Sequence, residues 1–195
     1  MHLDQGGIEY YGTQYGLGDE SVLIKEIGNK KVGFIGINDT NYPLDSSKVV
    51  GLIKNIENKA DHIIVNIHWG QEYELEAHAR QKFLAYEMVD AGADVIIGHH
   101  PHVIQEVEVY KNKPIFYSLG NFVFDQYFSK ETQEGLAVGV VLKQDEILLY
   151  LFPLISEKSM VRHMGFGKVR ILFDRVTKKV DNENKDDKIL KIHIK

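Results

Sequence analysis

The fold is decided by one stretch, which reads IIVNIHWGQEYELEAHARQKFLAYEMVDAGADVIIGHHPHVIQEVEVYKNKPIFYSLGNFVFD from Ile63 to Asp125. It contains two apolar runs rich in β-branched residues, 63–67 and 95–97, and each run ends in histidine. A helical pattern from about residue 76 to 91 separates the two runs. A strand, a crossover helix and a second strand predict a parallel pair in an α/β sheet. The histidines follow the carboxyl ends of both strands, and open α/β sheets bind ligands at that edge.

The composition is that of an ordinary globular protein. The chain has 195 residues, of which 44% are hydrophobic and 26% charged, enough for one domain with a real core. The formal net charge of -5 indicates no basic surface, so we predict no nucleic-acid partner. The absence of cysteine excludes disulfides and thiolate metal ligands. No apolar run approaches the ~20 residues of a membrane-spanning helix, and no signal peptide is recognisable.

The rest of the sequence predicts further strands and helices around this unit. Additional strands are expected at residues 21–27, 31–37, 103–110, 114–119, 136–142 and 147–155. A helix is expected from residue 45 or 46 to about 59, and residues 8–11 could form a short strand. Residues 169–173 could begin a strand or a helix, and residues 181–188 read as a solvated loop. We therefore predict an α/β sandwich with a mixed sheet, with its core at about 8–155 and a tail at 156–195.

The histidines are the residues best suited to bind a metal. Imidazole is a common ligand of divalent cations such as zinc. The loop GHHPH, residues 98–102, holds His99, His100 and His102, and two of these rings can point the same way. His68 would join them from the neighbouring strand. The alternative is that each histidine is a core or surface residue with its own hydrogen-bond partner, but three in one loop facing a fourth favour a metal site.

Four further residues near these loops have open roles. We expect Trp69 to pack beside the site, because its ring is large and its N–H needs a partner. Glu72 is a candidate acid/base group, a partner that orients an imidazole, or a solvated loop acid. Asn121 either belongs to a simple turn or places its amide at the same edge, where it would bind an anion or a metal. Asp125 is a weaker candidate of the same kind.

Four motifs resemble the CapA family of bacterial capsule (poly-γ-glutamate) synthesis proteins, which is related to calcineurin-like metallophosphoesterases. They are HWGQEY at 68–73, GAD at 92–94, GHHPHV at 98–103 and YSLGNFVFD at 117–125. The resemblance extends from about Ile8 to Leu154. It implies a calcineurin-like metallophosphoesterase sandwich with α-β-β-α layers and mixed sheets. It also implies two divalent metal ions, Mn, Zn or Fe, at the strand ends.

The motifs and the resemblance together assign roles to seven residues. His68, His100 and His102 are the expected metal ligands, with His99 as an alternative first member of the final pair. Glu72 and His99 are the expected catalytic groups. Asn121 and Trp69 are the expected substrate-binding residues.

The sequence departs from the family pattern before Ile8. Family members begin with an Asp-bearing motif and further acidic and Asn-His motifs, which supply metal ligands, and this sequence has none of them. We therefore expect it to be the C-terminal portion of such a fold, incomplete at the N-terminus. Members of the family often sit outside the cytoplasmic membrane through an N-terminal segment that this sequence lacks, so the sequence leaves the compartment open.

Three functions follow as hypotheses. The first is a metal-dependent hydrolase that acts on a phosphoester or an amide-like bond. The second is a non-catalytic component of capsule polymer synthesis or export, or an inactive fragment that lacks the N-terminal ligands. The third is a structural α/β domain whose histidines are incidental. The expected partners are an anionic polymer or phosphoester substrate and other capsule synthesis proteins.

Overall fold

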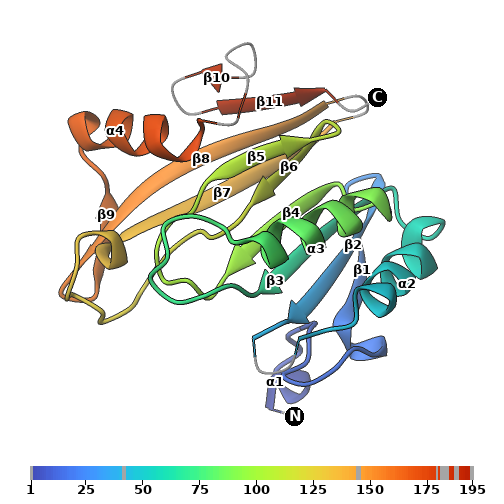
Figure 1. Cartoon of the computed structure of the whole chain (residues 1–195). Helices are drawn as coiled ribbons and strands as arrows, with labels where there is room; N and C mark the ends of the chain where they lie inside the picture. Colours follow the sequence, from blue (N-terminus) through green and yellow to red (C-terminus); the bar gives the residue numbers. More distant parts are fainter. Residues whose placement is uncertain are drawn as a thin grey trace.

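The computed structural model of the chain describes residues 2–40, 43–143, 146–178, 180, 185–186 and 189–193. Two β-sheets lie face to face, and helices cover one side of the first sheet (Figure 1). The predicted α/β sandwich with mixed strands is therefore confirmed. Within the described residues, no helix is long and apolar enough to cross a membrane.

The first sheet is mixed and has the strand order β1-β2-β3-β4-β6-β5. Its four central strands, β2, β3, β4 and β6, are parallel, and an antiparallel strand closes each edge. The strands are β1 (Val22–Ile27), β2 (Lys30–Asn38), β3 (His62–His68), β4 (Val95–His99), β5 (Val107–Tyr110) and β6 (Lys113–Phe116). The central strands read as continuous apolar runs because both of their faces are buried.

The second sheet is antiparallel and has the order β10-β11-β8-β7, with β9 paired to β8. Its strands are β7 (Glu134–Leu142), β8 (Glu146–Glu157), β9 (Met160–His163), β10 (Lys185–Asp186) and β11 (Ile189–His193). Strands β9, β10 and β11 were not predicted. Gln144 and Asp145, between β7 and β8, lie outside the described residues, as does most of the expected loop at 181–188. Residues 8–11, a tentative strand in the sequence, form none.

Helices α2 (Ser46–Glu57) and α3 (Ala79–Asp90) pack on the outer face of the first sheet. Helix α2 begins at Asp45, whose side chain accepts a hydrogen bond from the Ser47 N–H, a standard N-cap. Helix α3 begins at His78, and the side chains of His78 and Gln81 each accept from the other's backbone N–H. Both helices bury an apolar face against β3 and β4, so the first of two cores lies between the helices and the sheet.

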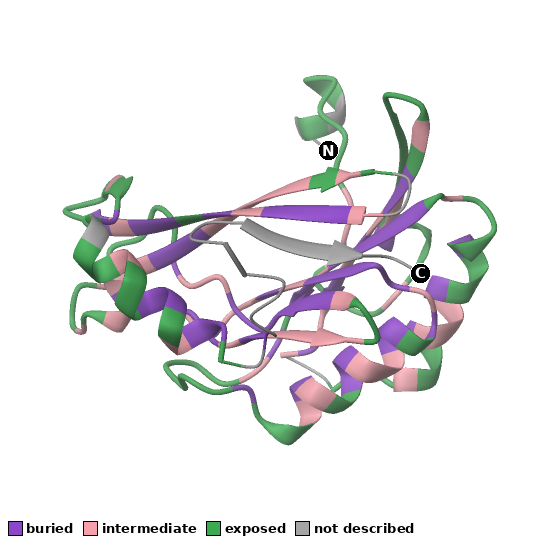
Figure 2. Ribbon diagram, turned by 90° about the horizontal axis from the view of Figure 1, so that it is seen from above, coloured by how far each residue is buried: buried purple, intermediate pink, exposed green. Residues whose placement is uncertain are grey.

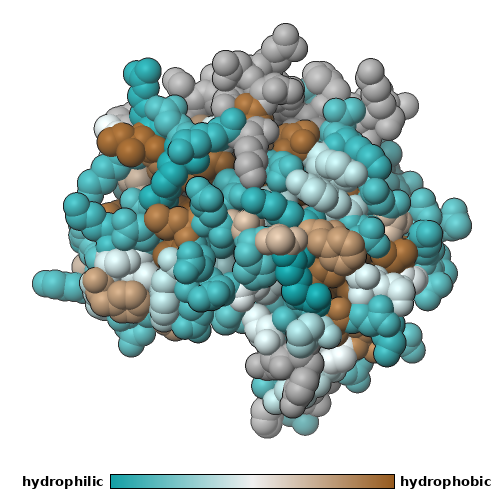
Figure 3. Space-filling model, in the orientation of Figure 1, coloured by the Kyte–Doolittle hydropathy of each residue, from teal (hydrophilic) through white to brown (hydrophobic). Residues whose placement is uncertain are grey.

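The second core lies between the two sheets, and α4 (Phe166–Val176) contributes to it. Leu172, Phe173 and Val176 of this helix join the cluster that holds Leu149 and Leu151 of β8. The ambiguous residues 169–173 are therefore helical. Figure 2 shows the buried residues along the strands and on the inward faces of the helices. The face in Figure 3 is mainly hydrophilic, and its hydrophobic side chains lie in separate patches.

A short contact between the two sheets leads directly to the candidate site. After β6, the Leu119 carbonyl accepts a hydrogen bond of 2.8 Å from the Leu136 N–H of β7, and Gly120 bridges to Gly135. A Cβ on Gly135 would lie 2.0 Å from the backbone oxygen of Asn121, so only glycine allows this approach. The segment that carries Asn121 is thereby fixed against the second sheet.

Candidate metal centre

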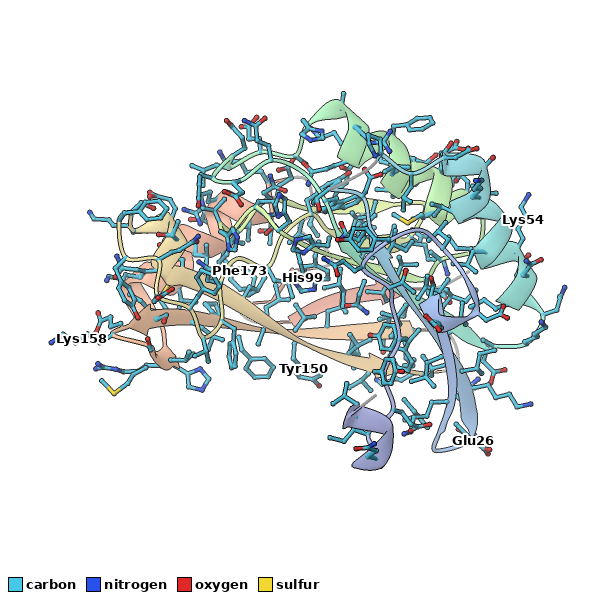
Figure 4. All side chains as sticks on the ribbon, turned by 90° about the horizontal axis from the view of Figure 1, so that it is seen from below. Glu26, Lys54, His99, Tyr150, Lys158 and Phe173 are labelled. Atoms are coloured by element: carbon cyan, nitrogen blue, oxygen red, sulfur yellow. The ribbon has the colours of Figure 1, made fainter. Side chains whose placement is uncertain are left out.

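The register of β3 and β4 brings two histidines to the same end of the sheet. His68 is the last residue of β3 and pairs with His99, the last residue of β4. Because side chains alternate along a strand, both rings lie on the face that carries Ile64 and Val95, toward the second sheet. In Figure 4, His99 is labelled near the middle of the molecule, where this strand end meets the second sheet.

The loops after β3 and β4 bring three ligand atoms together. One ligand atom each from Glu72, His100 and His102 lies within 4.8 Å of the other two. Two atoms bound to one cation at 2.0–2.2 Å lie no more than about 4.4 Å apart, so a small closure would let all three bind one ion. Two imidazoles and a carboxylate suit zinc, iron or manganese. We refer to these residues as the Glu72–His100–His102 cluster.

The other two histidines lie beside this cluster. The ring centroids of His68 and His100 are 4.6 Å apart, and those of His100 and His102 are 6.1 Å apart. His68 therefore neighbours His100 but is not one of the three converging residues. His99 lines two hollows, one of about 410 Å³ shared with His68 and one of about 300 Å³ shared with Asn121. The structure thus brings the four histidines and Glu72 to one end of the sheet, while Asp125 is outside the cluster.

The backbone of the cluster is strained. Tyr73, His100 and His102 have positive φ angles of 68°, 101° and 61°. Such conformations in residues other than glycine cost about 1–3 kcal/mol each and persist only where the surroundings enforce them. The two loops hold each other through the Tyr73 N–H, which donates to the Pro101 carbonyl at 2.8 Å. Strain of this kind concentrates at functional sites.

The electrostatic surroundings favour the neutral forms of the His68, His99 and His100 imidazoles. The pKa of His68 is lowered to about 4, first by desolvation of its ring and then by the neighbouring His100, His99 and His102. Desolvation also lowers the pKa of His99. For His100, desolvation lowers the pKa and Glu72 acts in the opposite direction. Neutral imidazole is the form that binds a metal, so no proton has to be removed from these rings at neutral pH.

Buried glutamines fix the loop that carries Glu72. The Gln105 side chain donates to the carbonyls of Glu74 at 2.9 Å and Glu76 at 3.2 Å, and accepts from Gln81 at 2.9 Å. Both glutamines are only 1% exposed. The sequence does not predict this pair, because an isolated glutamine carries no signal of which distant carbonyls it will meet.

Trp69 supports the site from behind. It is fully buried, its indole N–H donates to the Tyr117 carbonyl at 2.8 Å, and its ring stacks on Tyr117 at 5.9 Å. This agrees with the expected packing beside the site. The side chain leaves no exposed surface for a substrate, so the predicted substrate-binding role of Trp69 is not supported by its position.

Asn121 is turned toward the cluster. Its Oδ1 lies 2.8 Å from Nδ1 of His102, and its Nδ2 donates to the Thr132 carbonyl at 2.9 Å and to Oε1 of Gln126 at 3.2 Å. The side chain is buried, with 7% exposure. Its polar atoms are thus engaged within the protein rather than directed at solvent.

Aromatic side chains form one wall of the cluster. The ring of His102 lies 5.1 Å from Phe124 and 6.1 Å from Tyr73, and Phe128 packs edge-on against Tyr73 at 5.1 Å. These three aromatic side chains are exposed in part. They were not among the predicted site residues, although the aromatic residues at 122–128, directly after the Gly-Asn turn, are a signal that the sequence contains.

Fold and site together define a mixed α/β sandwich with a histidine–carboxylate cluster at the carboxyl ends of parallel strands. The family model described as bacterial capsule synthesis protein PGA_cap matches residues 1–126. The chain belongs to this family of bacterial capsule synthesis proteins.

Relatives in two bacilli agree with this assignment. The chain is 35% identical over 153 residues to the PGA biosynthesis protein CapA of Bacillus subtilis (strain 168), covering 71% of this chain and 40% of that protein. It is 50% identical over 101 residues to the capsule biosynthesis protein CapA of Bacillus anthracis, covering 51% of this chain and 25% of that protein. The match thus spans less than half the length of these relatives.

Among solved structures, the chain is similar to a Staphylococcus aureus protein provisionally described as a 5'-nucleotidase, in complex with alpha-ketoglutarate. The TM-score is 0.43 and the identity 15%, with 80% of this chain and 30% of that chain covered.

Proposed function

We propose that the chain carries a metal-dependent hydrolase site of a capsule synthesis protein. In this proposal His100, His102 and Glu72 hold a divalent cation, and His68 stands beside them as a further ligand. The observation that carries the proposal is the convergence of three ligand atoms within 4.8 Å on a strained backbone. A cation held there would act as a Lewis acid toward a phosphoryl or carbonyl oxygen.

The residues around the cluster then have distinct roles. Glu72 is assigned as a metal ligand, so His99 is the candidate proton acceptor. Desolvation of the His99 ring favours its neutral form, which can accept a proton. The hollow of about 410 Å³ beside His68 and His99 is where a substrate would lie, with Asn38 and Asn66 as polar lining. The aromatic wall of Tyr73, Phe124 and Phe128 would limit access of water from one side.

The charge of the Glu72 loop makes substrate binding depend on the cation. Glu72, Glu74 and Glu76 are exposed carboxylates within five residues. They repel an anionic polymer or a phosphoester unless a bound cation offsets them. We therefore propose an anionic substrate whose binding requires the metal, with other capsule synthesis proteins as partners.

Metal binding is the direct test. Purified chain dialysed against Zn²⁺ or Mn²⁺ should retain the cation in stoichiometric amount by elemental analysis, and the double variant His100→Ala/His102→Ala should lose it. His163→Ala, on the exposed strand β9, is the matched control and should bind as the natural chain does. Turnover of bis(p-nitrophenyl) phosphate and of poly-γ-glutamate is then measured with and without metal. The proposal fails if the natural chain and the double variant retain equal amounts of cation.

A non-catalytic role in polymer synthesis or export is the second candidate. It is favoured by the coverage of 40% and 25% of the two CapA relatives, because groups required for turnover can lie in parts that this chain does not match. Stoichiometric metal binding without metal-dependent turnover of either substrate would favour this role over hydrolysis.

A further inference from the structure

We infer that Asn121 is a positioning residue that selects the tautomer of His102 and links His102 through hydrogen bonds to Gln126 and Tyr73, the residue after Glu72. This differs from the substrate-binding role that the sequence suggested. The tautomer follows from the geometry alone. The effect on cation affinity rests on the proposed function.

The orientation of the Asn121 amide is fixed by a group that can only accept. The carbonyl oxygen of Thr132 lies 2.9 Å from Nδ2 of Asn121, and a carbonyl has no proton to donate. The nitrogen of the amide must therefore face Thr132, and Oδ1 faces His102. The backbone of Asn121 has little room to turn, because its oxygen lies close against Gly135.

This orientation determines which ring nitrogen of His102 carries the proton. Oδ1 of an amide is an acceptor, so the contact of 2.8 Å requires a proton on Nδ1 of His102. In the neutral ring, Nε2 then has a free lone pair, which is the atom that can bind a cation. A hydrogen bond at one ring nitrogen commonly fixes the other as the metal ligand.

A second set of hydrogen bonds leads from Asn121 toward Glu72. Nδ2 of Asn121 also donates to Oε1 of Gln126, at 3.2 Å, and Nε2 of Gln126 donates to the Tyr73 hydroxyl at 3.1 Å. Because the Tyr73 oxygen accepts from Gln126, its own proton is free to point toward the adjacent Glu72 carboxylate, with which it interacts. One buried amide thus connects His102 of the cluster to Tyr73, which lies beside Glu72.

The tautomer can be read directly by NMR. Long-range ¹H–¹⁵N spectra of the metal-free, ¹⁵N-labelled chain at pH 8 distinguish protonated from unprotonated ring nitrogens, and His102→Gln identifies the signals of His102. We expect a protonated Nδ1 and an unprotonated Nε2 in the natural chain. Asn121→Ala should give a mixture of tautomers. Gln126→Ala, which breaks only the hydrogen bonds that lead to Tyr73, should keep the natural tautomer and serves as the matched control.

Cation binding supplies the second readout. Asn121→Ala should weaken Zn²⁺ affinity about 10- to 100-fold in calorimetric titrations, as is usual for partners of metal-binding histidines. Gln126→Ala should weaken it less. An Nε2-protonated His102 in the natural chain would overturn the inference even if Asn121→Ala did not fold. An unchanged tautomer in a folded Asn121→Ala would overturn it as well. The predicted tautomer in a chain that binds no metal would refute the proposed function and leave the inference about Asn121 standing.

Discussion

At Gly98, a single added methyl group should disturb both the core and the candidate site. Gly98 lies on β4 directly before His99, and a Cβ there would lie 2.1 Å from the Tyr117 oxygen and 2.4 Å from Nε1 of Trp69. Contacts under 3.0 Å are essentially absent between real Cβ atoms and their neighbours. Gly98→Ala therefore requires the Trp69–Tyr117 hydrogen bond to break or the strands to separate.

The cost of this substitution can be assembled from two contributions. Overpacking of a tight core costs about 1–3 kcal/mol. A buried N–H or carbonyl left without its partner costs about 1–3 kcal/mol more. Added together, these contributions should lower the free energy of unfolding of Gly98→Ala by about 2–6 kcal/mol, a large part of the roughly 5–15 kcal/mol typical of a domain.

The chain contains one tryptophan, Trp69, so its fluorescence reports directly on this contact. Urea unfolding should show the loss of stability, and the emission of native Gly98→Ala should shift toward that of exposed indole. Gly51→Ala is the matched control, because a Cβ at this position in α2 meets nothing within 4 Å. Alanine is the better helix former by roughly 0.5–1 kcal/mol, so this control should be neutral or stabilising. A Gly98→Ala variant as stable as the natural chain, with unchanged emission, would refute the reasoning.

Three further predictions concern the cluster. Gln105→Leu leaves the Gln81 amide without its buried hydrogen-bond partner and should lower the free energy of unfolding in urea by about 1–3 kcal/mol. Amide hydrogen exchange in residues 70–78 should become faster, and unchanged exchange there would contradict the role of Gln105 in holding this loop. Because the pKa of His68 is lowered to about 4 in the folded chain, the unfolded chain binds more protons than the folded chain between about pH 4 and 6.5. The contribution of His68 to the free energy of unfolding is therefore present above pH 6.5 and is lost as the pH falls toward 4. In His68→Gln, the free energy of unfolding should fall less steeply with decreasing pH over this range. An unchanged slope would contradict the assignment of this pH dependence to His68. Because the backbone of residue 100 has a φ of 101°, which glycine adopts more readily, His100→Gly should be more stable than His100→Ala by about 1–2 kcal/mol, although both variants lose the imidazole. Equal or reversed stabilities in thermal unfolding would show that the backbone at residue 100 is not strained.

The parts of the fold that could be predicted are those where burial dictates the sequence. Strands β3 and β4 are covered on both faces, so their apolar runs identify them, and their ends place the histidines. The strands at the C-terminal end gave no such signal. Met160–His163 is short and partly charged, and Ile189–His193 lies beside a charge run that read as loop. The choice between strand and helix at residues 169–173 was decided by packing of Leu172 and Phe173 against β8, which local sequence does not reveal.

The sequence predicted that the histidines would meet at one end of the sheet, but not which residues hold their loops. Histidines on adjacent strand ends must approach one another once the strands pair in register, as His68 and His99 do. The partners that hold the loops come from far along the chain: Gln105 reaches Glu74 across 31 residues, and Asn121 reaches His102 across 19. Such contacts depend on how the loops cross, and no spacing rule encodes them.

The location of the backbone strain bears on why the histidines occupy these positions. Glycine would relieve a positive φ at residues 100 and 102 without loss of local geometry, and the chain uses glycine freely for this purpose at Gly70, Gly92 and Gly120. Positive φ angles also occur at Lys111, Asn112, Lys158 and Ser159, but His100 and His102 lie in one loop, and histidine there retains a cost of about 1–3 kcal/mol each that glycine would remove. The cost is explained if the imidazoles themselves are needed, because their ring nitrogens are two of the three ligand atoms of the cluster. The same reasoning does not extend to Trp69, whose burial accounts for its presence without any role in binding.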